Sequence, residues 1–358
     1  MSASAPQPIS EAKLHEFVMK AVGEMGAALN AALIVVGDKL GLYKAMAGAG
    51  PLTSAELAAK TKTTERYVRE WLAAQAAGGF VTYDASTQKY ELPPEQATAL
   101  ADEQSPVFLP GFFEIVGACM RDEAKITDVF RTGKGMGWHE HDHALFAGTE
   151  RFFRPNYRAH LINEWIPALG DITARLQNGA KVADVGCGLG TSTILMAEAF
   201  PKSTFFGFDY HPASIEMARQ AAAKAGVADR VKFEVGKAKD YPGKDYDFVA
   251  FFDCLHDMGD PEGAARHVLG TLGPNGAWMI VEPFAHDKLE DNLNPIGRVF
   301  YAASTMLCTP ASLSQEVGLG LGAQAGEGRL SKILKSAGFT RVRRAAETPF
   351  NIVLEARP

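Results

Sequence analysis

The chain has 358 residues, of which 47% are hydrophobic and 22% are charged, an ordinary composition for a soluble globular protein. The length is too great for one small core and predicts two domains, or one α/β domain with a large appendage. The net charge of −6 argues against a surface that binds nucleic acid strongly, although it leaves room for a local basic patch.

The cysteines and the N-terminus indicate where the protein resides. Cys119, Cys187, Cys254 and Cys308 lie far apart without a CxxC pattern, which predicts reduced thiols and not a disulfide frame or a zinc knuckle. The first residues lack the basic and apolar regions of a secretory signal. The longest apolar run, 31–36, is too short to span a bilayer. We therefore expect a cytoplasmic protein with no membrane partner.

The first hundred residues predict a small domain that is mostly helical. Apolar side chains at helical spacing over 11–48 indicate one or two amphipathic helices. Two further helices, joined by a tight turn, and a hairpin of two short strands come next. We expect the two helices to start at Ser54 and at Thr63 or Thr64. The two strands are expected at 80–84 and 89–93. This order is the outline of a winged helix.

The rest of the chain predicts a helical segment and then an α/β domain. Residues 95–170 read as mostly helical, with an irregular centre at 131–143. From 178 onward short apolar strands alternate with helices, which predicts a mostly parallel sheet with helices on both faces and an antiparallel far edge. The expected strands are 181–186, 203–209, 230–236, 246–255, 277–283, 340–348 and 351–356. We place the domain boundary near 165–178, giving domains 1–100, 101–170 and 171–358.

A glycine-rich loop follows the first strand of the sheet. Its glycines are Gly186, Gly188 and Gly190, whereas the dinucleotide fingerprint would need its last glycine at 191, which is Thr191. A phosphate-binding Gly-Lys-Ser/Thr ending is also missing. Asp184 would repel a pyrophosphate but suits a ligand that carries an ammonium group, such as S-adenosylmethionine, with the glycines allowing close approach of the nucleoside. The alternative is a tight turn that binds nothing.

A second acid ends the next strand. Asp209 lies where a carboxylate can accept hydrogen bonds from both ribose hydroxyls, and it would reject a 2′-phosphate. The alternative role for this side chain is that of a helix cap.

The pairing of "DVGCGLG" with "FDY" resembles the class I S-adenosylmethionine-dependent methyltransferases over residues 178–358. The resemblance implies a Rossmann-like domain with seven strands, S-adenosylmethionine as cofactor and S-adenosylhomocysteine as product. It also implies adenine contacts with the backbone at Ala238 and Lys239, because the family often has an acid where Lys237 stands. Tyr210 either packs on the adenine or is a surface tyrosine.

The end of the fourth strand, "FFDCLHDMGDP", resembles a segment of the winged-helix small-molecule O-methyltransferases and of a bacterial group that shares it. The resemblance makes His256 the general base, a role that suits imidazole at neutral pH. Glu282 would orient it. The alternative for His256 is a capping or core histidine, because S, N and C acceptors need no base. Asp253 could bind the methionine ammonium or face the acceptor.

Three further stretches bear on the acceptor. On an extended segment His139, His141 and His143 would share one face and could bind a metal, line the acceptor pocket or form a solvated loop. Phe153 and Tyr157 come next in the chain, and their side chains either form part of the pocket wall or pack in the core. We assign no metal ligand. The family resemblance implies that an irregular insertion at 284–327 covers the acceptor site. We expect Asp257 and Asp260 to serve as local caps and turn residues.

Three functions compete. The leading hypothesis is methyl transfer to a small molecule, with an O acceptor favoured and S or N possible. A DNA-binding regulator that senses S-adenosylmethionine is the main rival, but Arg66 and Arg69 on the recognition helix are balanced by Glu65 and Glu70. The third is an inactive scaffold. In the resembling enzymes the winged helix is a dimerisation platform, so we expect a homodimer and no nucleic-acid partner.

Overall fold

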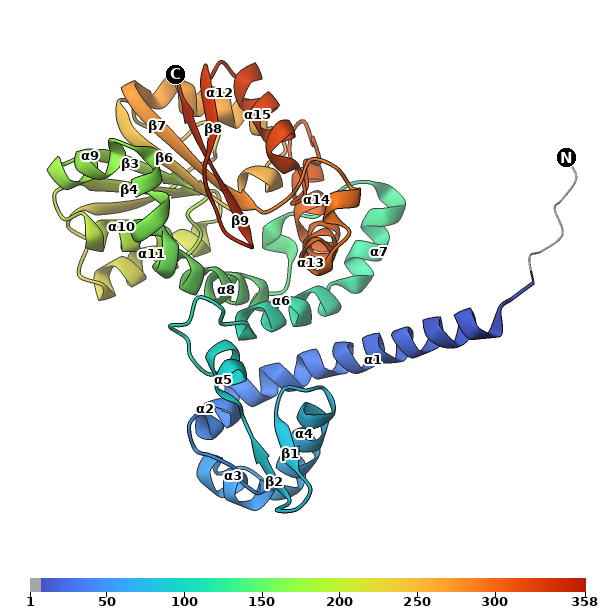
Figure 1. The fold of residues 1–358 in the computed structure, drawn as a ribbon. Helices are drawn as coiled ribbons and strands as arrows, with labels where there is room; N and C mark the ends of the chain where they lie inside the picture. The colour runs from blue at the N-terminus through green and yellow to red at the C-terminus, as the bar shows by residue number, and fades with distance from the viewer. Residues whose placement is uncertain (1–7) are drawn as a thin grey trace, which may run out of the picture. The chain divides into compact units, whose positions relative to one another are not determined.

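A computed structural model describes residues 8–358, which fall into two compact units divided between Gly117 and Ala118. Figure 1 shows the elements of both units in chain order. The second unit contains a seven-stranded sheet and the first contains a two-stranded hairpin. The structure thus has the expected α/β architecture, which follows a mostly helical N-terminal part in the chain.

The first unit has the predicted winged-helix outline. Its core forms where Tyr43, Leu57 and Trp71 pack together, and the indole of Trp71 donates a hydrogen bond to the carbonyl of Leu33. The elements are α1 (Glu11–Lys39), α2 (Leu42–Met46), α3 (Ser54–Thr61), α4 (Glu65–Ala77), β1 (Thr82–Asp84), β2 (Lys89–Glu91) and α5 (Pro94–Leu100). The cap of α3 is Thr53 and not Ser54, because Thr53 and Glu56 form a reciprocal capping box.

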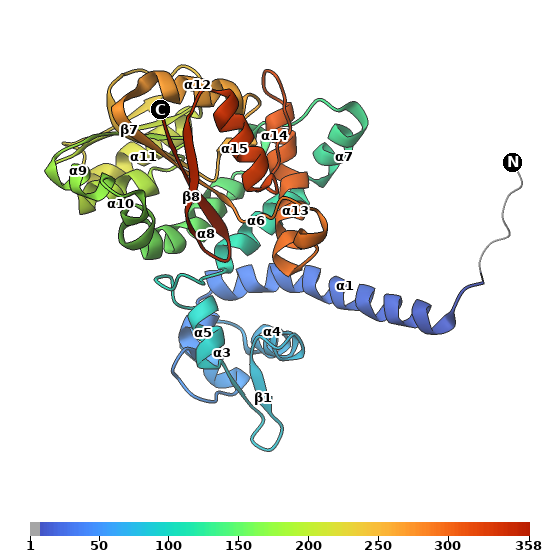
Figure 2. The same ribbon diagram turned by 45° about the horizontal axis from the view of Figure 1, so that its top comes forward.

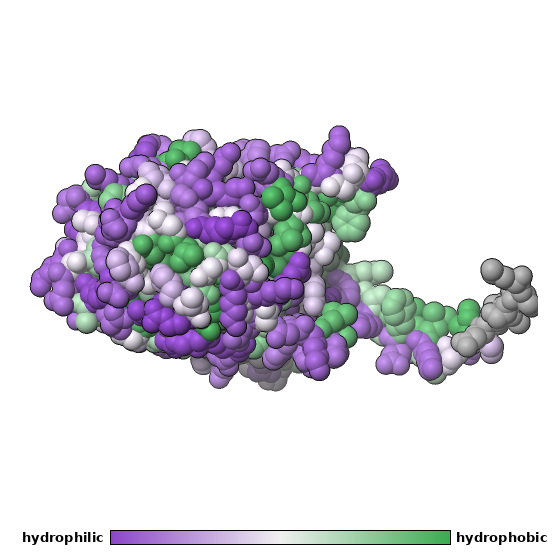
Figure 3. Space-filling model, turned by 90° about the horizontal axis from the view of Figure 1, so that it is seen from above, coloured by the Kyte–Doolittle hydropathy of each residue, from purple (hydrophilic) through white to green (hydrophobic). Residues whose placement is uncertain are grey.

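Helix α1 leaves most of its apolar side chains exposed. Phe17 is 67% and Leu29 is 74% exposed, and Figure 3 shows part of this apolar surface along the helix. Within residues 8–358, α1 is also the one helix long and apolar enough to cross a membrane by length and composition, which is weak evidence for a lone helix near the N-terminus. Exposed apolar surfaces of this kind are typical of protein–protein or membrane interaction sites.

The second unit begins earlier than the boundary expected near 165–178. Residues 118–170 belong to the same compact unit as the sheet, because α8 contacts α10 and Thr191 donates a hydrogen bond to Glu150 at 2.8 Å. The elements are α6 (Pro110–Arg121), which spans the division, α7 (Glu123–Thr132), η1 (Trp138–Glu140), α8 (Ala144–His160), η2 (Leu161–Trp165), η3 (Pro167–Leu169) and α9 (Ile172–Asn178).

The sheet has the strand order β5-β4-β3-β6-β7-β9-β8. Its strands are β3 (Lys181–Val185), β4 (Thr204–Asp209), β5 (Val231–Val235), β6 (Tyr246–Phe252), β7 (Leu272–Pro283), β8 (Arg341–Glu347) and β9 (Asn351–Arg357). The first five are parallel, and β9 runs antiparallel between β7 and β8. The antiparallel edge was predicted, but the insertion of β9 inside β8 was not.

Helices cover both faces of this sheet, as Figures 1 and 2 show. One apolar core joins α9, α10 (Thr191–Ala199) and α11 (Pro212–Lys224) to one face. A second core joins α12 (Pro261–Thr271) and α15 (Gly326–Ser336) to the other face. Because apolar residues cover both sides, the central strands β3 and β6 are almost entirely buried, as in other parallel sheets.

The stretch 284–327, expected as irregular, is mostly helical. It contains η5 (Glu290–Asn292), α13 (Pro295–Ala303), the π-helical turn η6 (Ser304–Cys308) and α14 (Thr309–Leu313). Asn294 caps α13 by accepting a hydrogen bond from the backbone of Gly297, and Pro295 occupies the first helical position. The glycines and prolines that suggested a loop therefore act as helix starts and as the turn that follows α14.

Candidate functional site

One cavity of about 540 Å³ lies at the carboxyl ends of β3, β4 and β6. Ligands of open α/β sheets bind at this edge, because the loops that follow parallel strands meet there. The wall includes the glycine loop, the ends of β4 and β6, the loop after β5 and one side of α8. All of these segments belong to the second unit.

The glycine loop bends sharply at the end of β3. Gly186, Gly188 and Gly190 have φ values of 76°, 52° and 82°, which glycine adopts without strain. A Cβ on Gly186 would lie 2.7 Å from the sulfur of Cys254, and one on Gly190 would lie 2.6 Å from the ring of Phe233. Gly186 and Gly188 line the cavity, whereas Gly190 caps α10 and packs against β5.

Asp209 lies in the cavity wall at the end of β4. Its Oδ2 accepts a hydrogen bond from the backbone of Gly188 at 3.0 Å, and its Oδ1 accepts one from His211 at 2.9 Å. Burial raises the pKa of this carboxyl, while the two backbone donors oppose the rise. The side chain therefore fixes the loop and also presents an acceptor to the cavity.

Asp184 lies beneath the glycine loop instead of in the cavity wall. Its Oδ2 accepts hydrogen bonds from the hydroxyls of Ser192 and Thr193, both at 2.6 Å, and its Oδ1 has no hydrogen-bond partner among the described residues. Burial raises its pKa to about 6. This placement does not fit the expected direct contact with a ligand ammonium, because the start of α10 separates the carboxylate from the cavity.

Asp253 lies in the cavity wall at the tip of β6. Its carboxylate accepts hydrogen bonds from the hydroxyl of Tyr157 and the amide of Asn351, both at 2.8 Å. Burial raises its pKa to about 7, helped by the nearby charge of Glu282. Its φ of 49° is in the left-handed region, which aspartate tolerates better than most residues.

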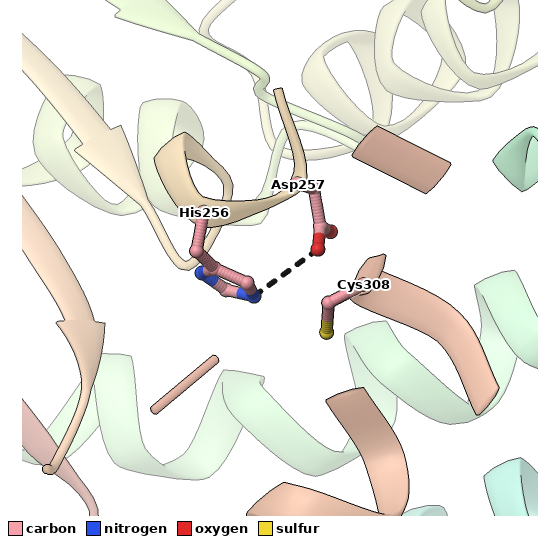
Figure 4. Close-up of side chains that lie close together, drawn as sticks. All are labelled: His256, Asp257 and Cys308. Atoms are coloured by element: carbon pink, nitrogen blue, oxygen red, sulfur yellow. Dashed lines mark ion pairs between the residues drawn. The ribbon is translucent and has the colours of Figure 1, made fainter. Parts of the chain in front are cut away.

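His256 is held between two carboxylates. Its Nδ1 lies 2.6 Å from Oε2 of Glu282, and its Nε2 lies 3.2 Å from Oδ1 of Asp257, as the dashed line in Figure 4 marks. The backbone of Leu255 donates to the other oxygen of Glu282, and Trp138 donates to Oδ2 of Asp257 at 2.9 Å. The expected pairing of His256 with Glu282 is therefore present, while Asp257, expected as a local cap, contacts the imidazole.

The electrostatics of this group favour a charged imidazole. Burial lowers the pKa of His256, but the carboxylates of Glu282 and Asp257 outweigh burial and raise that pKa well above its ordinary value. Asp257 lines the cavity, whereas His256 and Glu282 are not among the described residues that line it. Asp257 thus separates the imidazole from the cavity.

Cys308 reaches the same group from η6, as Figure 4 shows. One donor atom each from His256, Asp257 and Cys308 lies within 4.8 Å of the others, and these are donor types that zinc accepts. Burial raises the pKa of the Cys308 thiol to about 12, so the thiol is neutral at ordinary pH. A charged imidazole between Glu282 and Asp257 offsets the charge of these carboxylates without a metal ion.

The three histidines of 139–143 do not share a face. The turn η1 rotates the chain, because Glu140 caps it by accepting from the backbone of Gly137. His139 lines the cavity, whereas His141 is buried with its Nδ1 2.9 Å from Asp122, and His143 is exposed at the start of α8. The expectation of one common surface, for a metal or for the acceptor, is therefore wrong.

Several other predicted residues do meet at the cavity. Its wall contains Tyr210, Ala238, Lys239, Phe153 and Tyr157. The Tyr210 ring lies 6.1 Å from that of His139. The ammonium of Lys239 lies 2.9 Å from Asp260 and 3.1 Å from Glu316, so its charge is matched at the cavity rim.

Sequence patterns missed several residues of the site. Trp138 and Asn351 are 119 and 98 residues away from the aspartates that they contact. His211 stacks on Phe146 with ring centroids 4.9 Å apart. Only His211 had a usable signal, since it follows the acid that ends β4; the others depend on contacts between distant segments.

Two protein-family models match the chain. Residues 27–102 match the Rv2258c-like winged HTH domain, and residues 176–338 match a methyltransferase domain. The first match covers the winged helix, and the second covers most of the sheet and the glycine loop.

Curated relatives match part of the chain. Ajmaline N-methyltransferase of Rauvolfia serpentina is 30% identical over 120 residues, which are 32% of this chain and 40% of the relative. A protein of Oryza sativa subsp. japonica named "Probable tocopherol O-methyltransferase, chloroplastic" is 28% identical over 176 residues, which are 45% of this chain and 48% of the relative. The chain thus spans less than half the length of these relatives.

Solved structures match nearly the whole chain. The mitomycin 7-O-methyltransferase MmcR has a TM-score of 0.68 at 20% identity, covering 98% of this chain and 100% of that one. Human N-acetylserotonin methyltransferase, solved in complex with SAM, has a TM-score of 0.64 at 18% identity, covering 100% of this chain and 99% of that one. At these identities the likeness establishes a shared fold.

Proposed function

The chain combines a winged-helix domain with a methyltransferase domain, and from this premise we propose that it transfers a methyl group from S-adenosylmethionine to a small molecule. An oxygen acceptor is favoured, because the cavity adjoins a histidine held between carboxylates. When bound, S-adenosylmethionine supplies an electrophilic methyl group on its sulfonium.

The observation that carries the proposal is the charge of the cavity and its surroundings. Asp184, Asp209 and Asp253 are buried or half-buried carboxylates that pair with no lysine or arginine within residues 8–358. Burial raises the pKa of all three. Such a site is stabilised by a cationic ligand, because a nearby positive charge offsets the lost hydration of the carboxylates. It disfavours a pyrophosphate.

The same residues fit the parts of that cofactor. Asp209 presents an acceptor for ribose hydroxyls, and Gly186 and Gly188 leave room for a close approach of the ligand. Tyr210 offers a ring for stacking, and Ala238 and Lys239 line the same cavity. The wall there thus suits a nucleoside.

The proton of an acceptor hydroxyl has a route to His256. The methyl group bonds to the acceptor oxygen while the S–C bond electrons stay with sulfur, so the hydroxyl proton must leave to a base. Asp257 lines the cavity and lies 3.2 Å from Nε2 of His256, and Glu282 stabilises the resulting imidazolium. The carboxylates of Glu282 and Asp257 raise the pKa of this imidazole, so its base form becomes more populated as the pH rises.

The apolar part of the wall indicates the kind of acceptor. Trp138, Phe146, Phe153, Tyr157 and Phe252 line the cavity on the side of α8 and β6. Aromatic rings of this kind bind flat apolar molecules. A phenolic compound therefore fits better than a small aliphatic alcohol.

The exposed apolar side of α1 supports a homodimer. Its exposed residues include Phe17, Met25 and Leu29. In α4, Arg66 is 2.6 Å from Glu70 and Arg69 is 2.6 Å from Glu65, so this helix offers no excess positive charge for DNA. A cytoplasmic dimer that binds no nucleic acid is the assembly we propose.

The proposal is tested with the full chain by calorimetry and by methyl transfer. Titration with S-adenosylmethionine, S-adenosylhomocysteine and NAD should give micromolar binding of the first two and none of NAD. A panel of phenols, thiols and amines with labelled S-adenosylmethionine should then give methylated phenols. Binding of NAD alone would overturn the proposed cofactor, and turnover of thiols or amines alone would overturn the proposed acceptor atom.

A further inference from the structure

The carboxylate of Asp253 is held by Tyr157 in the cavity wall and by Asn351 behind that wall. Tyr157 reaches it from α8, and Asn351 reaches it from the start of β9, each through one hydrogen bond of 2.8 Å. Asn351 is 1% exposed, and its amide oxygen accepts a hydrogen bond from Asn156 at 2.8 Å. The amide of Asn351 therefore has one orientation, in which its nitrogen donates to the carboxylate of Asp253 and, at 3.4 Å, to the carbonyl of Glu282.

The backbone of Asp253 is fixed as well. Its N–H donates to the carbonyl of Val281 on β7 at 2.8 Å, although its φ of 49° is unusual for a residue with a side chain. Strained conformations of this kind persist where the surrounding structure imposes them. Two side chains and one backbone bond from three different elements do so here.

The charge of this carboxylate has no counterion. The two side chains that hold it are neutral, and the charged groups that face it are Glu282 on β7 and His256 on η4. His256 already lies 2.6 Å from Glu282. Asp253 is thus a fixed carboxylate in the cavity wall without a cationic partner. Such a carboxylate can bind a cationic group of a ligand.

The strand order indicates which part of the ligand arrives there. Asp209 ends β4, β3 lies next to it, and Asp253 follows β6 on the other side of β3. With strands about 4.8 Å apart, the two acids are separated by roughly 10 Å along the same edge. If the ribose lies at Asp209, the amino-acid half of the ligand extends toward β6.

We propose that Asp253 binds the α-ammonium group of the cofactor, in place of Asp184, and that Asn351 is the residue that positions it. This assignment rests on the proposed function. Asp184 stays a structural acceptor for the start of α10. The sequence could not indicate Asn351, which lies 98 residues from Asp253.

The test compares two ligands that differ in the amino-acid half. S-adenosylhomocysteine carries the α-ammonium, whereas 5′-methylthioadenosine has the same nucleoside and sulfur without it. In Asp253→Asn, which keeps the shape and tolerates a positive φ, we expect at least tenfold weaker binding of S-adenosylhomocysteine and less than twofold change for 5′-methylthioadenosine. Calorimetry on the full chain measures both.

The positioning role of Asn351 needs its own readout. Asn351→Leu removes a hydrogen bond that lowers the pKa of Asp253, so that pKa should rise from about 7. The pH at which S-adenosylhomocysteine binding reaches its plateau should therefore move upward, with threefold to tenfold weaker binding at pH 7. Asn292→Leu is the matched control, because Asn292 is 3% exposed and bonded to His286 away from this wall.

The outcomes separate this assignment from the proposed function. Equal weakening of both ligands in Asp253→Asn, or an unmoved pH profile in Asn351→Leu, would overturn the assignment. If Asp253→Asn weakened the binding of S-adenosylmethionine but not that of S-adenosylhomocysteine, Asp253 would contact the sulfonium and not the ammonium. That result would also overturn the assignment. Failure of the unmodified protein to bind S-adenosylhomocysteine would refute the proposed function itself.

Discussion

Replacing Asp209 by alanine tests the proposed ribose contact at the end of β4. Its carboxylate accepts hydrogen bonds from the backbone of Gly188 at 3.0 Å and of His211 at 2.9 Å, and it lines the cavity. Alanine removes the acceptor of these two backbone N–H groups and the acceptor for the ribose. The variant should therefore bind the cofactor more weakly and lose some stability.

The magnitude follows from counting the lost bonds. Two ribose hydroxyls bonded to a carboxylate contribute about 1.5–3 kcal/mol each, so their loss amounts to at least about 3 kcal/mol, or more than a hundredfold in affinity. Water that fills the space partly replaces these bonds, which makes tenfold the lower limit. The two backbone donors add about 1–3 kcal/mol to the loss of folding free energy.

The assay is calorimetric titration of S-adenosylhomocysteine into both proteins, with urea unfolding as the measure of stability. Asp229→Ala is the control for a lost negative charge, because Asp229 is an exposed acid paired with Arg230 outside the cavity. Unchanged affinity in Asp209→Ala would refute the ribose assignment. Equal weakening in the control would show that net charge, not contact, governs binding.

Three further predictions concern the base, the loop and the helix α1. His256→Gln should lower turnover of a phenol by about 10²–10⁴-fold with S-adenosylhomocysteine affinity unchanged, and equal turnover would exclude a base here. The rate should rise with pH as the raised pKa of His256 is passed, and Glu282→Gln should move that rise to lower pH. Gly190→Ala should lower the free energy of unfolding by about 1–3 kcal/mol more than Gly226→Ala, which shares the positive φ but meets no atom within 4 Å; equal losses in urea unfolding would contradict the clash. Leu29→Asp should turn a dimer into a monomer in light scattering, and an unchanged mass would place the interface elsewhere.

Helix α8 shows why the compact unit around the sheet begins before the boundary expected from the sequence. The sequence of α8 has helical spacing like the segments before it, and nothing local distinguishes a linker helix from one that lines a cavity. Its membership in the second unit follows from contacts such as that between Glu150 and Thr191. Such contacts depend on packing, which no local pattern contains.

The prediction that the histidines of 139–143 share one face was wrong for a related reason. Their alternate spacing predicts one face only if the segment is extended, since side chains alternate in a strand. The hydrogen bond from Gly137 to Glu140 forms a turn instead, and Asp122, which lies between α6 and α7, binds His141. The backbone of this segment is turned and not extended, and a contact with Asp122, outside the motif, holds His141 in that arrangement.

What the sequence determined by itself is local. Alternating apolar strands and helices predict the sheet, and Gly186 with Asp209 predict a loop and an acid at one edge, because parallel strands bring their carboxyl ends together. Only the tertiary structure decided which acid faces the cavity. Asp184 lies near the end of β3, and Asp253 follows β6. The start of α10 covers Asp184, whereas Tyr157 and Asn351 hold Asp253 in the cavity wall. That difference arises from side chains that meet only after folding.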